Sequence, residues 1–156
     1  MIDDLYSARI LSLAANLPHS GRLESPQGSA EQVAKLCGSK AIVDVVLDDQ
    51  QRISQFAQTV KACALGQAGA GVVGEAVIGA SISELTCARD DMLAMLKSGG
   101  EGPAGRFEGL RILKQVADYP ARHASSMVAI EATLAAALEA LEKHHTDSRT
   151  RLVGAA

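Results

Sequence analysis

Aromatic side chains are nearly absent from this chain of 156 residues, which contains no Trp, two Tyr and two Phe. A core without large rings must be built from Ala, Leu, Val, Ile and Met, and these smaller side chains suit closely packed helices. Because apolar residues still make up 47% of the sequence, the chain is long and apolar enough to form one domain with a core of its own.

Long apolar runs and an excess of basic charge are also lacking. No apolar run approaches the roughly 18 residues that span a bilayer, and the acidic N-terminus lacks a secretory signal pattern. The net charge is −3 and no basic patch stands out along the sequence. We therefore expect a cytoplasmic protein whose partners include neither a membrane nor a nucleic acid.

The common catalytic motifs are missing as well. There is no Gly-rich phosphate loop after a strand, no G-x-S-x-G and no H-E-x-x-H. The acidic pairs Asp48-Asp49 and Asp90-Asp91 are better explained as solvated charges than as acid/base pairs. The sequence gives no reason to expect an enzyme.

The hydrophobic pattern predicts helices around one small sheet. Its fold class is α+β, with a small three-stranded antiparallel sheet packed against about five helices. The expected helices cover residues 3–17, 65–78, 82–96, 107–116 and a long stretch after Pro120, and the expected strands cover residues 32–36, 40–47 and 52–61. We expect residues 1–143 to form a single domain and residues 144–156 to form a flexible C-terminal tail.

Two of the three cysteines lie where the predicted structure changes. Cys37 precedes Gly38, which predicts a turn with an accessible sulfur. Cys63 lies where a strand gives way to a Gly/Ala-rich helix, and a helix N-terminus favours thiolate, the form that binds metal and attacks sulfur. Alternatively, each is a small residue at a tight or buried position. Cys87 is interpreted as a helix-packing residue, and disulfides are not expected in a reducing compartment.

Four short stretches stand out in sequence order: residues 16–21 (NLPHSG), 36–39 (LCGS), 61–64 (KACA) and 122–129 (RHASSMVA). In these stretches and in the order of its predicted elements, the chain resembles the iron–sulfur cluster assembly scaffold family, of the IscU type and the N-terminal domain of NifU-like proteins. The resemblance spans roughly residues 5–142.

Members of that family hold a nascent iron–sulfur cluster, or zinc, on three cysteines and an aspartate. The resemblance places the metal ligands at Cys37, Ser39, Cys63 and Ser125, so only two good ligands remain. Serine hydroxyls are poor ligands for iron–sulfur clusters and zinc. His123 is a candidate replacement, although the family's histidine position falls on Ala124, and Ser125 and Ser126 are also candidate helix caps.

The resemblance implies a scaffold-like protein that binds iron, a labile Fe–S cluster or zinc through Cys37 and Cys63. A cysteine desulfurase and cluster-acceptor proteins are its implied partners, and a homo-oligomer is a further option, because two protomers can share one cluster. Two alternatives stay open: a carrier of persulfide sulfur on Cys63, or a degenerate interaction module of the same fold that binds no metal.

Overall fold

The computed structural model describes residues 7–154, and the side chains of residues 7–146. In chain order its elements are α2 (Ala8–Ala15), β1 (Gly28–Ala34), β2 (Ser39–Leu47), β3 (Ile53–Lys61), α3 (Ala64–Ala76), α4 (Ile82–Ser98), the 3₁₀ helices η1 (Gly105–Asp118) and η2 (Pro120–Arg122), and α5 (His123–Gly154). The strands form one antiparallel sheet in the order β1-β2-β3, which confirms the predicted α+β class.

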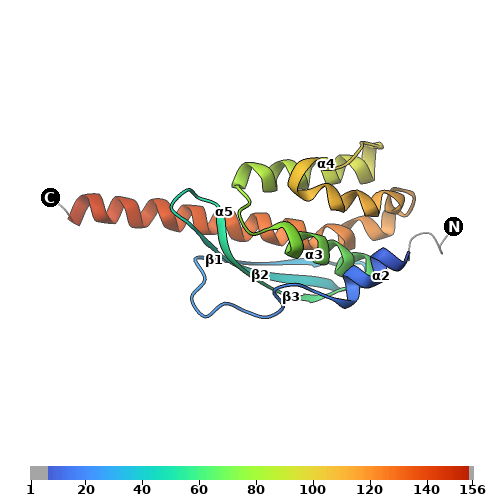
Figure 1. Ribbon diagram of the computed structural model, residues 1–156, viewed down its shortest axis with the longest axis horizontal. Coiled ribbons are helices and arrows are strands. Elements are labelled where there is room, and N and C mark those ends of the chain that lie inside the picture. The colour runs from blue at the N-terminus through green and yellow to red at the C-terminus, as the bar shows by residue number, and fades with distance from the viewer. Residues whose placement is uncertain (1–6, 155–156) are drawn as a thin grey trace.

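The helices stack on one face of the sheet (Figure 1). The long helix α5 packs on β1 and β2, while α3 packs beside it against α5, β3 and α2. The pair α4 and η1 forms an outer layer that contacts α3 and α5. The core between these layers consists of aliphatic side chains from the strands and from every helix except η2, such as Val43 on β2, Leu65 on α3 and Ile130 on α5, together with the two Phe residues.

The central hairpin follows directly from the sequence. Alternate residues of β2, including Val43, Val45 and Leu47, are buried against the helices, as period-two patterning requires. Strand β3 was expected at residues 52–61 and β2 at 40–47, so both are confirmed to within one residue. Helix α4 begins with a capping box, in which the Ser81 hydroxyl accepts from the Glu84 N–H and the Glu84 carboxylate accepts from the Ser81 N–H.

The first strand was misplaced by the sequence analysis, which expected residues 32–36. Strand β1 ends at Ala34 instead, because residues 35–38 form the turn into β2. The Gly38 N–H donates to the Ala34 carbonyl at 2.9 Å, and Gly38 has φ +72°, a conformation that glycine adopts without strain. The strand therefore begins at Gly28, inside the segment expected to be a loop.

Close backbone packing explains several glycines. A Cβ at Gly28 would collide with the Ala136 carbonyl of α5, so β1 and α5 approach closely only because Gly28 lacks a side chain. A Cβ at Gly71 would lie 2.7 Å from the Leu13 carbonyl of α2. Small residues in α3 thus let neighbouring helices come close, as the sequence predicted. This packing offsets the poor helix propensity of the four glycines in the helix.

Helix α5 extends through Gly154 beyond the end of the sheet (Figure 1). The first helix begins at Ala8, and residues 3–6 of its expected span lie outside the described residues. The segment Pro120–Thr146 is long and apolar enough to cross a membrane, yet 67% of its most apolar window is buried inside the domain. That burial is typical of a core helix. The division into a domain over residues 1–143 and a flexible tail stays a prediction.

Candidate metal centre

Three segments distant in sequence meet at one end of the sheet. They are the turn between β1 and β2, the junction between β3 and α3, and the first turn of α5. Lys40 of β2 pairs with Lys61 of β3, so the turn before β2 and the junction after β3 lie side by side. The start of α5 lies against the first turn of α3, close enough that a Cβ at Gly66 would lie 2.9 Å from the Ser125 carbonyl oxygen.

Cys37 and Cys63 occupy the two positions that the sequence singled out. Cys37 is exposed on the turn, immediately before Gly38. Cys63 is the N-cap residue of α3 and is partly buried. Both predicted settings, an accessible turn thiol and a thiol at a helix N-terminus, are confirmed.

Two buried serines connect the thiols. The Cys37 sulfur is hydrogen-bonded to the Ser39 hydroxyl at 3.1 Å, and the Ser39 and Ser125 hydroxyls are hydrogen-bonded at 2.9 Å. The Ser125 hydroxyl is in turn hydrogen-bonded to the Cys63 sulfur at 3.1 Å. Ser39 and Ser125 are 2% and 0% exposed. The four residues that the resemblance assigned as ligand positions therefore form one continuous chain of polar contacts.

The surroundings of Cys37 favour the thiolate. Hydrogen bonding from the Ser39 side chain and backbone lowers the pKa of the Cys37 thiol, and slight burial opposes this only weakly. Ser125 and the positive charge of Arg122 lower the pKa further.

The surroundings of Cys63 also lower the pKa of its thiol, although burial opposes this more strongly than it does at Cys37. Partial burial raises the pKa of the Cys63 thiol, but the Ser125 hydroxyl, the free backbone N–H groups of Gly66 and Leu65, and the Arg122 side chain together lower it below its ordinary value. The sulfur makes no hydrogen bond of full capping geometry with α3. The unpaired amides of the first helical turn therefore act on the sulfur mainly through their dipole field, in addition to the Ser125 hydrogen bond.

Arg122 is a functional candidate that the sequence analysis quoted within a motif but gave no role. It lies three residues before Ser125, and residues three apart share one face of a helix. Its charge lowers the pKa of Cys37, and hydrogen bonding from its side chain lowers the pKa of Cys63. Its spacing of three residues from Ser125 is the sequence feature from which a role for Arg122 at the site could have been predicted.

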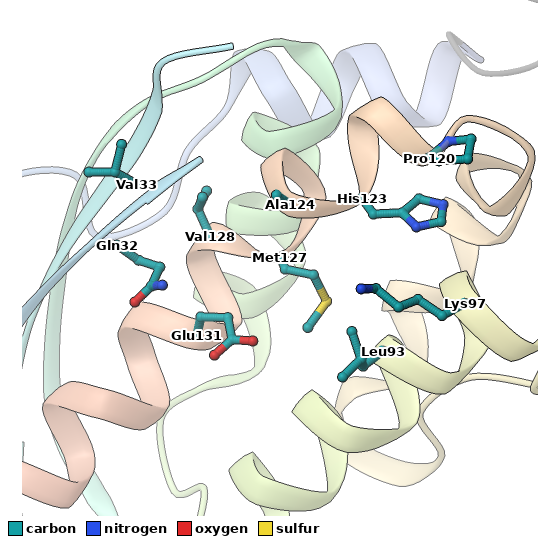
Figure 2. A pocket seen from close by; sticks show the side chains of 10 residues that line it. All are labelled: Gln32, Val33, Leu93, Lys97, Pro120, His123, Ala124, Met127, Val128 and Glu131. Carbon is teal, nitrogen blue, oxygen red and sulfur yellow. The ribbon is translucent and has the colours of Figure 1, made fainter. Parts of the chain in front are cut away.

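His123 is placed differently from the sequence expectation. Two residues along an α-helix are rotated by roughly 200°, so His123 and Ser125 face nearly opposite directions. The His123 Nε2 donates to the carbonyls of Val116 and Ala117 at 3.0 and 3.2 Å. Figure 2 shows the ring on the side of α5 that faces Leu93 and Lys97 of α4, in a cavity of about 610 Å³.

Comparison with known proteins shows the family and the fold. The family model of the NifU-like N-terminal domain matches residues 5–146. The chain belongs to the NifU-like N-terminal domain family. A crystal structure of a nitrogen-fixing NifU-like protein (N-terminal) from Brucella abortus has 43% sequence identity and a TM-score of 0.87, covering 91% of this chain and 98% of that one.

More distant structures share the fold. A putative iron–sulfur cluster assembly scaffold protein for the SUF system from Fervidobacterium islandicum AW-1 has 20% identity and a TM-score of 0.77, covering 85% of this chain and 96% of that one. A search of curated proteins finds no match.

Two smaller interpretations of this NifU-like domain were wrong. Cys87 was taken as a packing residue, but it is exposed on α4 because it points away from the core face that carries Leu85 and Ala88. Ser125 and Ser126 do not cap α5, which already begins at His123. The Ser126 hydroxyl instead donates to the Arg122 carbonyl at 3.0 Å, within the same turn.

The donor set of the NifU-like domain fits thiophilic metal, but only in part. The site offers two thiols, which are linked through the Ser39 and Ser125 hydroxyls, and thiolates select iron–sulfur clusters and zinc over hard cations. Within the part of the chain that the structure describes, no three His, Cys, Asp or Glu side chains gather as metal ligands. His123 therefore does not complete a trio with Cys37 and Cys63.

Proposed function

We propose that this NifU-like domain is an iron–sulfur cluster assembly scaffold that holds iron or a labile cluster on Cys37 and Cys63. The observation that carries the proposal is the polar chain from Cys37 through Ser39 and Ser125 to Cys63, which links two thiols from separate segments whose pKa is lowered by their surroundings. Membership of the family supports the same role, and the Fervidobacterium neighbour is described as a scaffold of this kind.

Incomplete ligation suits a scaffold, because a cluster that must be passed on should not be enclosed. Cys37 is exposed and Cys63 partly so, which leaves a path for transfer. Arg122 would favour the thiolates and balance the negative charge of the bound cluster. The chain itself makes and breaks no bond of an organic substrate, so we propose no enzymatic activity. A cysteine desulfurase would supply sulfur, and acceptor proteins would receive the cluster.

The proposal is tested by anaerobic reconstitution of the purified protein with iron and sulfide. We expect bound iron together with visible charge-transfer absorption that persists through a desalting column. Zinc, which binds the same thiolates, is measured in the freshly purified protein by plasma mass spectrometry. A protein that retains neither iron nor zinc would contradict the scaffold role.

A persulfide carrier is the second candidate, favoured by the Cys63 thiol. Its surroundings lower the pKa of the thiol and leave it partly exposed, and both conditions favour an attacking thiolate. The Cys63 thiolate would attack the outer sulfur of a desulfurase persulfide, form a new S–S bond and release the desulfurase thiolate. Incubation with a desulfurase and cysteine should then add the mass of one sulfur to Cys63. Absence of that adduct in a protein that binds iron would remove this candidate alone.

A further inference from the structure

A cavity outside the candidate metal centre has the composition of a small-molecule site. It has a volume of about 610 Å³ and lies between α4, the first turns of α5 and the end of β1 (Figure 2). Its walls are mostly apolar and include Met127 and Val128 of α5. Val33 and Leu93, which also line it, are 45% and 37% exposed. A ligand that covered these side chains would be stabilised by the burial of apolar surface, provided that it also matched the polar groups of the cavity.

One unpaired cation faces this cavity. Lys97 of α4 lines it, and Figure 2 shows the amine of its side chain directed inward, toward Met127. Among the side chains of residues 7–146, which the structure describes, Lys97 has no ion-pair partner. An anion bound inside the cavity would therefore gain a charge-assisted hydrogen bond from the Lys97 ammonium without displacing an existing partner.

His123 presents a hydrogen-bond acceptor beside Lys97. Its Nε2 must carry the proton, because both of its partners are carbonyl oxygens, those of Val116 and Ala117. In the neutral ring Nδ1 is then an acceptor, and no group within the described part of the chain donates to it. The side chain is 9% exposed, and Figure 2 shows this second nitrogen on the side of the ring that faces Lys97. A ligand O–H or N–H next to the anionic group would satisfy this acceptor.

The other charges of the cavity limit the ligand to a single negative charge. Figure 2 shows Glu131 separated from Lys97 by Met127. The Glu131 carboxylate lies 3.7 Å from the Arg89 guanidinium, which balances its charge. One carboxylate balances Lys97, whereas a phosphate monoester with two negative charges would leave one uncompensated. A ligand ammonium beside His123 would approach Lys97 and be repelled, but a hydroxyl group donates without carrying charge.

We propose that this cavity binds a small 2-hydroxy carboxylate with an apolar body. The carboxylate accepts from the Lys97 ammonium, and the 2-hydroxyl group donates to Nδ1 of His123. The apolar body packs on Met127, Leu93 and Val33. This site does not rest on the proposed scaffold function, because it uses none of the thiols or serines of the metal centre.

A fluorescent probe tests the site directly. The chain contains no Trp, so the fluorescence of an indole compound reports binding without an indole background from the protein. The probe is indole-3-lactate, a 2-hydroxy carboxylate whose ring can lie against the sulfur of Met127. At a fixed probe concentration, we expect the fluorescence anisotropy to rise and saturate as protein is added. No rise up to about 1 mM protein would overturn the site.

Three relatives of the probe test the parts of this assignment. Indole-3-propionate lacks the hydroxyl group, indole-3-lactamide lacks the negative charge, and tryptophan carries an ammonium in place of the hydroxyl group. We expect each to bind about threefold or more weakly than indole-3-lactate, with the lactamide the weakest. Equal binding of the propionate would overturn the role of His123, and equal binding of the lactamide would overturn that of Lys97. Tighter binding of tryptophan would overturn the choice of a hydroxy acid.

A charge-removing variant tests Lys97 itself. Lys97→Met removes the charge and keeps an unbranched side chain, and we expect it to weaken the binding of indole-3-lactate about tenfold or more. Its control Lys143→Met, at an exposed position of α5 outside the cavity, should bind the probe as wild type does. Both variants should match wild type in thermal unfolding, which separates lost binding from misfolding. Equal affinity in all three proteins would overturn the site.

A cavity-filling variant tests the location. Ala124 lines the cavity at an exposed position, so the ring introduced by Ala124→Phe would occupy the space proposed for the ligand. Its control Ala135→Phe makes the same change at an exposed position of α5 that does not line the cavity. We expect no saturable binding in the first variant and wild-type binding in the second. Undiminished binding in Ala124→Phe would place the probe elsewhere and overturn the assignment of this cavity.

Discussion

Removing the Ser125 hydroxyl should raise the pKa of Cys63. In Ser125→Ala the thiol loses the 3.1 Å hydrogen bond that helps its charged form, while the burial that opposes ionisation remains. A hydrogen bond to a charged group contributes about 1.5–3 kcal/mol, and one pKa unit corresponds to about 1.4 kcal/mol. Because Cys63 is partly exposed, water replaces some of that bond, so we expect a rise of about one unit.

The assay is the pH dependence of iodoacetamide alkylation, resolved by peptide mass spectrometry so that Cys63 is followed separately from the other thiols. The matched control is Ser126→Ala, one residue along the same helix. Ser126 is also buried, at 2% exposure, but its hydroxyl donates to the Arg122 carbonyl rather than to a sulfur. We expect the pH midpoint of Cys63 alkylation to rise in Ser125→Ala and to stay unchanged in Ser126→Ala. An unchanged midpoint in the first, or an equal shift in both, would refute the role of Ser125.

Three further predictions concern ligation and stability. Ser125→Cys should slow the decay of visible cluster absorption after anaerobic reconstitution, since a third thiolate replaces a poor ligand. Adding Ser39→Asp should slow the decay further. Equal decay rates in wild type, the single variant and the double variant would show that these positions do not face the metal. Gly28→Ala should lower the free energy of unfolding, measured by urea denaturation, by about 1–3 kcal/mol or more. The new Cβ would meet the α5 backbone, including the Ala140 nitrogen at 2.7 Å. Its control Glu31→Ala, at an exposed position of the same strand, should change the free energy of unfolding little. Asp44→Asn should lower the free energy of unfolding by about 2 kcal/mol at pH 7, because the buried carboxylate accepts from Arg22, Ser29 and the Leu23 N–H. The difference in stability from wild type should shrink as the pH falls below about 4.

The sign of the Asp44 prediction follows from its environment. Burial raises the pKa of Asp44, but the hydrogen bonds from Arg22, Ser29 and Leu23 outweigh it, so the folded pKa lies below the unfolded value. Such a group adds stability that is fully present above the unfolded pKa and is lost as the pH falls through the folded one. A difference between wild type and Asp44→Asn that is constant from pH 7 to pH 3 would contradict this.

The elements that the sequence predicted well are those with strong local patterning. The Val- and Ile-rich run of β2 and the capping box at Ser81 each depend on residues close together in the chain, so their pattern is visible in the sequence. The first strand was misplaced because its start depends on the packing of Gly28 against α5, more than a hundred residues away in the chain. Such a contact has no local signature.

The site was predicted in the same uneven way. The settings of Cys37 and Cys63 follow from a neighbouring Gly38 and a small-residue helix, and the resemblance placed Ser39 and Ser125 beside them. The orientation of His123 could not be settled, because it depends on carbonyls at the end of η1 that accept its ring N–H. The gathering of Lys35, Lys61 and Arg122 at this end of the sheet could not be predicted from the sequence, because these residues come together only when the three segments fold against one another.

The central claim, that Cys37 and Cys63 are the metal ligands, is tested most directly by the iron content of three matched variants. Cys37→Ala, Cys63→Ala and Cys87→Ala are each reconstituted anaerobically beside wild type and desalted before analysis. Cys87 is exposed on α4 outside the Cys37–Ser39–Ser125–Cys63 chain and controls for the loss of any thiol. We expect iron to fall at least fivefold in the first two variants and to match wild type in the third. Equal iron content in all four proteins would contradict the account.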